Sequence, residues 1–186
     1  MTLMHTPVCD FGLPALDFKL KGVDGKFWTR DDCAGKNGLL VMFICNHCPY
    51  VKAIQQRLVE DAKVLQENGI GVVAIMSNDP NDYPEDSFEN MQRIAKEKGY
   101  NFPYLIDDTQ KTAKEYGAIC TPDFFGYNNK MELQYRGRLD ESGMQPSSHD
   151  AKRELVEAML EVAKTGKGPL EQVASMGCSI KWVAER

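Results

Sequence analysis

The sequence predicts an α/β fold with a mainly parallel central sheet. Strand-like and helix-like segments alternate along the chain, which is typical of this class. Two apolar runs, 38–44 and 71–77, have the composition of central strands that are buried on both faces. No repeat or Gly/Ser linker divides the pattern, so we expect one domain over 1–186, with its core at about 13–165 and a C-terminal tail at 166–186.

Each further element rests on a local pattern. Residues 16–21 and 26–29 alternate on either side of Asp24-Gly25, which indicates an N-terminal hairpin. Apolar residues in 49–67 recur on one helical face, and Asn68-Gly69 then ends the helix. The other predicted elements are a strand at 103–107, a late hairpin of 123–127 and 131–136, and helices from Asp86 or Ser87 to about Lys98, over 109–116 and over 150–164.

Composition and charge exclude several classes of protein. The chain is 42% hydrophobic and 26% charged, which is typical of a globular protein. Its net charge is −5 and its basic residues are scattered, so we expect no nucleic-acid partner. The longest apolar run, Leu39 to Cys45, is far shorter than the about 20 residues that cross a bilayer. The N-terminus has no basic or apolar region of a signal peptide, so we expect a cytoplasmic protein with no membrane partner.

The run Cys45-Asn46-His47-Cys48-Pro49 is the strongest chemical signal in the chain. Six cysteines occur, and only Cys45 and Cys48 are closely spaced; the others are Cys9, Cys33, Cys120 and Cys178. A single C-x-x-C beside a strand–helix pattern indicates a redox-active dithiol. A helix start favours thiolate over thiol, because its N–H groups and dipole attract negative charge. A structural zinc site normally needs a second ligand pair, so we expect no metal and no cofactor beyond a Cys45–Cys48 disulfide.

The strand 38–44, the dithiol and the following helix resemble the thioredoxin superfamily. The hairpin with Asp24-Gly25, followed by Gly35-Lys36, resembles its AhpC/TSA and TlpA/ResA branch. The resemblance implies a thioredoxin-like fold of three layers, α/β/α, with a central mixed sheet that an N-terminal hairpin extends. It also implies a thiol-disulfide oxidoreductase whose partners are protein thiols or disulfides and an unknown reductase or oxidase. It also implies that Cys45 is the more exposed, attacking cysteine and that Cys48 resolves the mixed disulfide.

The resemblance also assigns roles to three further residues: His47, Thr121 and Pro122. Thr121-Pro122 stands where the superfamily has a cis-proline, so we expect a cis bond and a Thr121 backbone that pairs with substrate. His47 precedes the second cysteine as it does in DsbA and in the disulfide isomerases. We therefore expect His47 to stabilise the thiolate and the protein to be more oxidising than thioredoxin, whose potential is about −270 mV.

Other residues are less informative. Cys120 lies beside Thr121-Pro122, and it is either an inert buried thiol or an accessory redox thiol. The role of Cys178 cannot be read from the sequence. Leu39 stands where thioredoxin has a buried Asp, which leaves the proton acceptor for Cys48 unnamed. The charges that follow the last predicted strand are expected to be solvated: Arg136, Arg138 and Asp140.

Two other functions compete with disulfide exchange. The first is a thiol peroxidase, because the N-terminal half resembles the AhpC/TSA branch. Peroxiredoxins carry T-x-x-C, and here Cys45 stands in the Thr position and Cys48 in the peroxidatic position, which argues against efficient peroxidase activity. The second is a copper-binding assembly protein similar to the Sco family, with His149 as the distant ligand, because two thiolates and an imidazole suit Cu(I). The Sco family has a C-x-x-x-C spacing, whereas this sequence has C-x-x-C.

Overall fold

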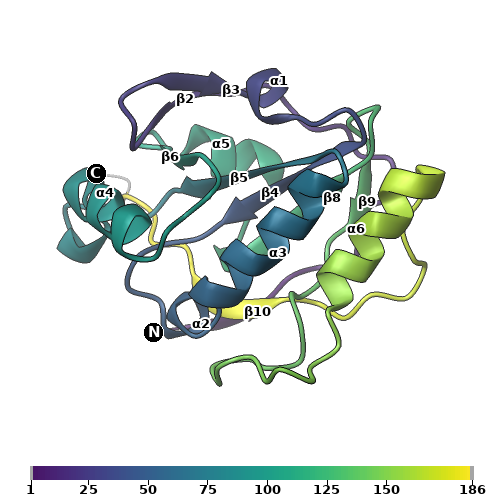
Figure 1. Ribbon diagram of the computed structural model, residues 1–186. Coiled ribbons are helices and arrows are strands. Elements are labelled where there is room, and N and C mark those ends of the chain that lie inside the picture. The colour runs from purple at the N-terminus through teal and green to yellow at the C-terminus, as the bar shows by residue number, and fades with distance from the viewer. Residues whose placement is uncertain (1, 185–186) are drawn as a thin grey trace.

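A seven-stranded mixed sheet forms the centre of the computed structural model, which describes residues 2–184 (Figure 1). Its strand order is β3-β2-β6-β5-β4-β8-β9, and a three-stranded sheet of order β1-β10-β7 lies at one end. The strands are β1 Leu3–His5, β2 Lys19–Gly22, β3 Phe27–Thr29, β4 Gly38–Phe43, β5 Ile70–Met76, β6 Tyr104–Ile106, β7 Cys120–Thr121, β8 Asp123–Tyr127, β9 Leu133–Tyr135 and β10 Met176–Ser179. The helices are α1 Arg30–Cys33, α2 Pro49–Lys52, α3 Gln55–Glu67, the 3-10 turn η1 Pro84–Asp86, α4 Phe88–Glu97, α5 Lys111–Tyr116 and α6 Glu154–Thr165.

Strand β4 lies in the interior of the sheet, as its apolar composition predicts. This strand pairs in parallel with β5 and antiparallel with β8, and all six of its residues are buried. Because neighbouring side chains of a strand point to opposite faces, β4 contributes to both cores. Leu40 and Met42 belong to one core, whereas Leu39, Val41 and Phe43 belong to the other.

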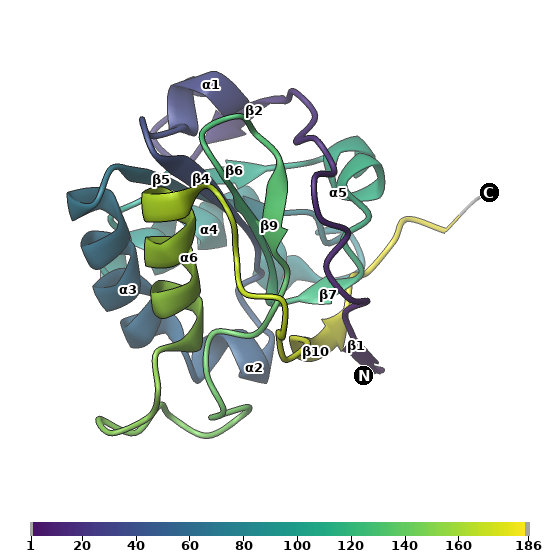
Figure 2. The ribbon, with the colours of Figure 1, turned by 90° about the vertical axis from the view of Figure 1, so that its right-hand side faces the viewer.

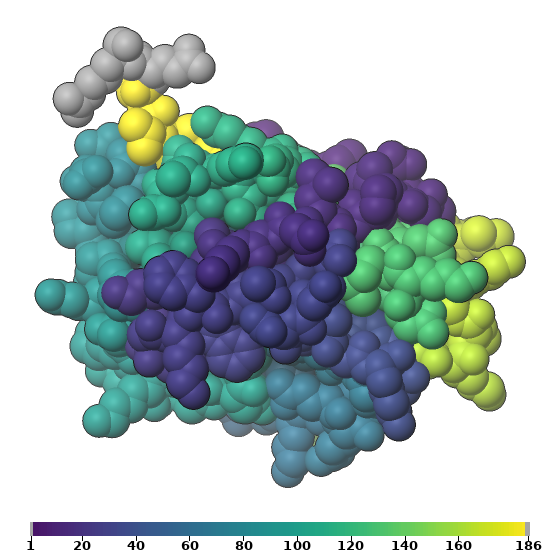
Figure 3. Space-filling model, turned by 90° about the horizontal axis from the view of Figure 1, so that it is seen from above, coloured from purple at the N-terminus to yellow at the C-terminus, as the bar shows by residue number. Residues whose placement is uncertain are grey.

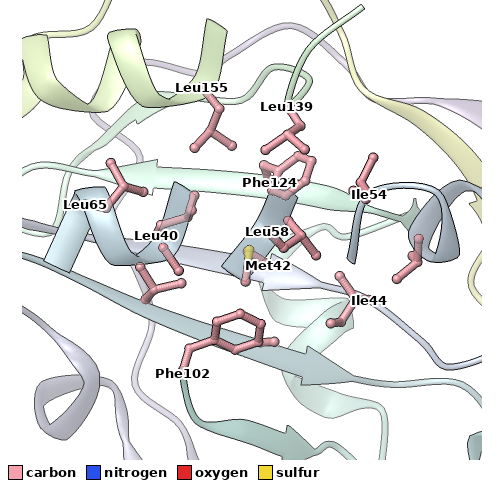
Figure 4. Packing of buried hydrophobic residues seen from close by; sticks show 14 of the residues in the cluster. Leu40, Met42, Ile44, Ile54, Leu58, Leu65, Phe102, Phe124, Leu139 and Leu155 are labelled. Carbon is pink, nitrogen blue, oxygen red and sulfur yellow. The ribbon is translucent and has the colours of Figure 1, made fainter. Parts of the chain in front are cut away.

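Helices cover both faces of the sheet, which confirms the predicted three layers. On one face α3, α4 and α6 bury apolar side chains against Leu40 and Met42, and Figure 4 shows Leu58 of α3 and Leu155 of α6 converging on Phe124. On the other face α5 packs through Tyr116. Figure 2 shows α3 and α6 side by side on one side of the sheet and α5 on the other.

The predicted N-terminal hairpin is confirmed by β2 and β3, and it extends the sheet beyond β6. Gly25 at its turn has φ +81°, a left-handed conformation that glycine adopts without strain. Seen from above in Figure 3, the chain before β4 spreads across this end of the molecule. The predicted strand 38–44 and late hairpin are also confirmed. The helix beginning at Asp86 or Ser87 is α4, whose N-cap is Ser87.

The predicted single helix over 49–67 is wrong in one respect, because the structure divides it into α2 and α3. Ile54 has φ −112° and ψ 1°, outside the helical region, and its N–H donates to Val51 three residues earlier. This tighter turn changes the axis between the two helices. Val51, Ile54 and Leu58 nevertheless all remain in the same core, so the apolar spacing predicted burial correctly but not the break.

The C-terminal region differs from its prediction at two points. Helix α6 begins at Glu154 rather than at residue 150, because Arg153 has a non-helical ψ of 72° while its guanidinium pairs with Asp61 of α3. The tail, for which the sequence gives no structure, contains β10. This strand pairs antiparallel with both β1 and β7, so it joins the two ends of the chain to the segment before Pro122.

The charges after the last strand are not all solvated, which corrects the expectation for Arg136 and Asp140. Both are buried, and Arg136 forms an ion pair of 3.0 Å with Asp123, which is fully buried on β8. The Arg136 guanidinium also lies over the ring of Phe125 and donates to the Gly117 carbonyl. The charged residue that directly follows β9 is therefore buried against β8. Among the described residues, no helix is long and apolar enough to cross a membrane.

Candidate active site

The dithiol lies in the loop that connects β4 to α2. The pairing of β4 continues to Ile44, whose N–H donates to Ile75, and Cys45 comes next. Cys48 is the N-cap of α2, and Pro49 occupies the first helical position, where no backbone hydrogen bond is lost. Cys45 is only 1% exposed and Cys48 is fully buried. The expectation of an exposed Cys45 at the helix tip is therefore wrong, because β7 and β10 lie beside the loop.

Cys45 and Cys48 interact through a side-chain hydrogen bond, which acts on the two thiols in opposite directions. The hydrogen bond from Cys45 lowers the pKa of Cys48 to about 5, and further hydrogen bonds from Cys178 and Thr121 act in the same direction. The same hydrogen bond, together with burial, raises the pKa of Cys45 well above its usual value. The reduced pair therefore carries its first negative charge on the Cys48 side.

One side of the pair, here called the sulfur side, consists of Thr121 and Cys178. The sulfur of Cys48 lies 2.8 Å from the sulfur of Cys178 and 3.3 Å from the Thr121 carbonyl oxygen, to which the protonated thiol donates. The Thr121 hydroxyl is 3.5 Å from the sulfur of Cys45. The Thr121–Pro122 bond is cis, as expected from its position. Thr121 therefore contacts both cysteines of the predicted dithiol.

The other side, here called the polar side, is organised by Asp86, which is fully buried. Its carboxylate accepts a 2.7 Å hydrogen bond from the backbone N–H of Asn46 and a 2.9 Å hydrogen bond from the Asn78 side chain. Asn46 in turn accepts from the hydroxyl of Tyr104 at 2.8 Å. These bonds fix the two residues between the cysteines to η1 and to β6, so the loop has a defined shape.

His47 joins the dithiol to the polar side. Its Nδ1 lies 2.6 Å from the Asp86 carboxylate, and its ring stacks on Tyr83 at 5.4 Å. The hydrogen bond to Asp86 raises the pKa of His47, and the negative charge on Cys48 acts in the same direction. The charged form of His47 beside the pair would favour thiolate, and the tuning role expected from the sequence stays a prediction. The neighbouring Asp86 offsets part of that charge.

Cys120 is the neighbour of Thr121 in the sequence, but its surroundings are those of an inert thiol. Its sulfur contacts the carbonyl oxygen of Pro122 at 3.6 Å, and burial raises its pKa far above the usual range. A thiol that stays protonated is neither a nucleophile nor a metal ligand. The geometry therefore favours the first of its two interpretations.

A metal-binding arrangement exists among the described residues, although the sequence predicts none. Ligand atoms of Cys45, His47 and Asp86 all lie within 4.8 Å of one another. The Asp86 oxygens are already engaged by Asn46, Asn78 and His47, so this cluster is held together by its own hydrogen bonds. His149, the distant ligand of the copper hypothesis, is exposed in the loop before α6 and does not belong to the cluster.

An apolar cavity of about 230 Å³ adjoins the cis-proline. Tyr50, Ile54, Pro122, Phe124, Leu139 and Val173 are among the residues that line it. It opens next to the dithiol loop, and its dimensions suit one side chain of a partner rather than a large ligand. Tyr50, which follows Pro49 on α2, thus borders the site.

Two residues of this site are missed by sequence reasoning. The sequence pattern places Asp86 only at the possible start of a helix, yet its carboxylate binds the backbone of Asn46, 40 residues away in sequence. Cys178 is 130 residues from Cys48 in sequence and only 2.8 Å away in space. A polar, proline-bounded loop before α4 was a weak signal for Asp86. No local pattern indicates the location of Cys178, because the pairing of β10 with β7 is a long-range contact.

Comparison with known proteins agrees with this geometry. The chain is 41% identical to an uncharacterized conserved protein from Geobacillus kaustophilus, with a TM-score of 0.91 over 100% of this chain and 99% of that one. It is 37% identical to a hypothetical protein from Sinorhizobium meliloti, with a TM-score of 0.89 over 99% and 100% of the two chains. A secreted Mycobacterium tuberculosis disulfide oxidoreductase, described as homologous to E. coli DsbE, shares the fold at 16% identity and a TM-score of 0.58, over 78% of this chain and 95% of that one.

A search of curated proteins found no match. The sequence profile of the AhpC/TSA family matches residues 11–140, which include the hairpin, the dithiol loop and the Thr121–Pro122 bond. The matched segment is more than two thirds of the chain. This protein therefore has a thioredoxin fold and belongs to the AhpC/TSA family.

Proposed function

We propose that the protein is a thiol-disulfide oxidoreductase that exchanges disulfides with protein partners through Cys45 and Cys48. The observation that carries the proposal is the placement of both cysteines at the start of α2, with the Thr121 hydroxyl 3.5 Å from the Cys45 sulfur. The hydrogen bond between the two cysteines lowers the pKa of Cys48, and a thiolate is the form that takes part in disulfide exchange. The apolar cavity beside Pro122 supports a peptide side chain as the group that the partner presents. No further cofactor enters the proposal.

The reduced pair supplies the two electrons of each cycle. Cys45 gives its proton to the Cys48 thiolate as it attacks the partner disulfide, and one partner sulfur leaves with an electron pair and takes up a proton. Cys48 then attacks the sulfur of Cys45, releases the second partner thiol and closes the Cys45–Cys48 disulfide. The proton of Cys48 goes to that leaving thiolate. An external dithiol reverses both steps and regenerates the reduced pair.

The polar side supports an oxidising bias. A protonated His47 and the hydrogen-bond donors around Cys48 stabilise the reduced, thiolate form over the disulfide. A disulfide whose reduced form is stabilised is a stronger oxidant, and the known range extends from about −270 mV in thioredoxin to about −120 mV in DsbA. We infer a potential above that of thioredoxin.

The test is catalysed reduction of insulin disulfides, with dithiothreitol as the electron source, for the wild type and single variants. We expect activity in the wild type and a background rate for Cys45→Ser and for Cys48→Ser. Cys9→Ser is the matched control, because Cys9 is a half-buried thiol outside the site, and it keeps wild-type activity. Cys48→Ser also traps partners as mixed disulfides on Cys45. A wild type at the background rate, or a Cys48→Ser variant with full activity, overturns the proposal.

Reduction of hydroperoxides is a second candidate, favoured by the family and by one feature of the site. Cys48 occupies the position of the peroxidatic cysteine by resemblance, and its pKa is lowered to about 5. A peroxidatic thiolate attacks the peroxide oxygen, releases water or an alcohol and becomes a sulfenic acid, which Cys45 then converts to the disulfide with loss of water. Peroxide consumption by the reduced protein, measured against the insulin rate, ranks the two activities.

A further inference from the structure

The edge of β7 that the resemblance assigns to a partner strand is occupied by the protein's own C-terminal strand. In the antiparallel pair of β7 and β10, Cys178 lies opposite Thr121 and Ser179 lies opposite Cys120. The approach is so close that a Cβ atom on Gly177 would lie 1.9 Å from the Thr121 carbonyl oxygen. Only glycine fits there, so the sequence at residue 177 is matched to this contact. In Figure 1 β10 passes beside α2, at the end of the sheet where the dithiol loop lies.

This pairing delivers a third cysteine to the dithiol. The sulfur atoms of Cys178 and Cys48 are 2.8 Å apart, whereas a disulfide bond joins two sulfurs at about 2.05 Å. A displacement of less than about 1 Å therefore closes the bond. Cys120 does not have this geometry, because its sulfur contacts the Pro122 carbonyl instead. Cys178 is thus the one of the two nearby cysteines that is in position to react with Cys48.

We propose that Cys178 is a third redox-active cysteine, which forms a reversible disulfide with Cys48 in exchange with the Cys45–Cys48 disulfide. The proposal rests on the proposed function of the dithiol and adds an internal partner to it. In the exchange step, the sulfur of Cys178 attacks the sulfur of Cys48. The Cys48–Cys178 bond forms, the Cys45–Cys48 bond breaks, its electron pair leaves with Cys45, and the proton of Cys178 goes to Cys45. The protein gains or loses no electrons, so this step needs no oxidant.

The charges around the three sulfurs determine when this step occurs. In the reduced protein, burial and the hydrogen bond to Cys48 together raise the pKa of Cys178 to about 12, so Cys178 remains a thiol in contact with Cys48. Once Cys48 is part of a disulfide it carries no negative charge, so it no longer raises the pKa of Cys178. The Cys48–Cys178 disulfide then fastens β10 over the site and returns Cys45 to the thiol form. In that form, a partner reaches Cys45 only after β10 has moved.

The test is the disulfide map of variants that lack Cys45, equilibrated in glutathione buffer. The Cys48 thiolate attacks glutathione disulfide and releases one glutathione, and Cys178 then displaces the second. After acid quenching and alkylation, peptide mass spectrometry identifies the bond. We expect Cys45→Ser to hold a Cys48–Cys178 disulfide, and Cys45→Ser/Cys178→Ser to accumulate at least about tenfold more Cys48–glutathione adduct. Cys45→Ser/Cys120→Ser is the matched control and behaves as Cys45→Ser does.

Two further measurements keep the outcomes distinct. Gly177→Ala in the Cys45→Ser background displaces β10 and lowers the yield of the Cys48–Cys178 bond, while circular dichroism checks that each variant is folded. Equal adduct in the Cys45→Ser variant with and without Cys178 overturns the proposal. If the oxidised wild type forms Cys45–Cys48 and reduces insulin in that case, the proposed function stands without Cys178. A Cys48–Cys178 bond in a wild type that never reduces insulin overturns the proposed function instead.

Discussion

The two sides of the dithiol differ in chemistry and in the sequence distance of their residues. On the polar side a buried carboxylate, Asp86, binds the backbone of Asn46 and the ring of His47. On the sulfur side the contacts to Cys45 and Cys48 come from Thr121 and Cys178, which carry no formal charge. The polar side therefore fixes the shape and the charge of the loop. The sulfur side provides hydrogen-bond partners for the two thiols, and one of these partners, Cys178, is itself a thiol.

This division predicts separate consequences for mutations on the two sides. A change on the polar side leaves buried donors without an acceptor, so its main cost is in the free energy of unfolding. A change on the sulfur side removes a neutral neighbour of the thiols, so its main effect is on thiol ionisation and on which disulfide forms. The predictions below test that separation.

The largest stability effect is expected from Asp86→Ala. The substitution leaves the Asn46 N–H and the Asn78 amide without their acceptor in a buried place, which should cost about 3 kcal/mol of unfolding free energy. Urea unfolding at neutral pH measures it. Asp82→Ala, an exposed carboxylate in the preceding loop, is the control and should change stability by less than about 0.5 kcal/mol. Equal losses in the two variants would contradict the role of the polar side.

The next effect is expected from Thr121→Val, which keeps the branched shape but removes the hydroxyl beside Cys45. One lost hydrogen bond to the pair should raise the apparent pKa of the first thiol ionisation by about one unit. Thiolate absorbance as a function of pH measures the shift. Thr112→Val, a buried threonine on α5, tests whether any buried hydroxyl has this effect, and it should leave the titration unchanged. If the thiols of Thr121→Val titrate as those of the wild type do, the Thr121 hydroxyl does not influence their ionisation.

A smaller effect concerns the pH dependence of stability. The hydrogen bond to Asp86 raises the pKa of His47 in the folded protein. A group with a raised folded pKa stabilises fully below its unfolded value of about 6.5, and this contribution is lost as the pH rises through the folded pKa. The stability difference between the wild type and His47→Gln should therefore decline above about pH 6.5. A difference that does not vary with pH would show that the His47–Asp86 contact is not an ion pair.

The smallest effect is expected from Cys120→Ala. Its thiol is buried, protonated and bonded only weakly to the Pro122 carbonyl, so insulin reduction should stay within about twofold of the wild-type rate, while stability falls by about 1 kcal/mol. The comparison with Cys178→Ser is informative, because both cysteines lie near the dithiol but only Cys178 contacts it. A strong loss of activity in Cys120→Ala would restore the accessory-thiol interpretation.

The sequence predicts the parts of this site that depend on local patterns. The apolar run of β4, the C-x-x-C spacing and Pro49 predict a dithiol loop at a helix start, and the Thr121-Pro122 pair predicts the cis bond by resemblance. Each of these signals lies within a few neighbouring residues. The order of strands and helices follows from similar local evidence.

The remaining features depend on contacts between distant segments. The burial of Cys45, the position of Cys178 and the anchoring of the loop by Asp86 all arise where segments 40 to 130 residues apart in sequence meet. Arg136 is similar, because a charge after a strand gives no indication of a buried partner such as Asp123. No periodicity encodes such contacts, and a tail with little pattern can still form a strand when a free edge is available.

The most direct test of the central claim is the redox potential of the Cys45–Cys48 pair. The protein is equilibrated in glutathione buffers of graded ratio, and the fraction oxidised is measured by alkylation and peptide mapping. We expect a two-electron transition that converts Cys45 and Cys48 to a disulfide, with a potential above the about −270 mV of thioredoxin. A potential at or below that value would contradict the oxidising role of His47. The absence of any disulfide that includes Cys45 and Cys48 would contradict the dithiol itself.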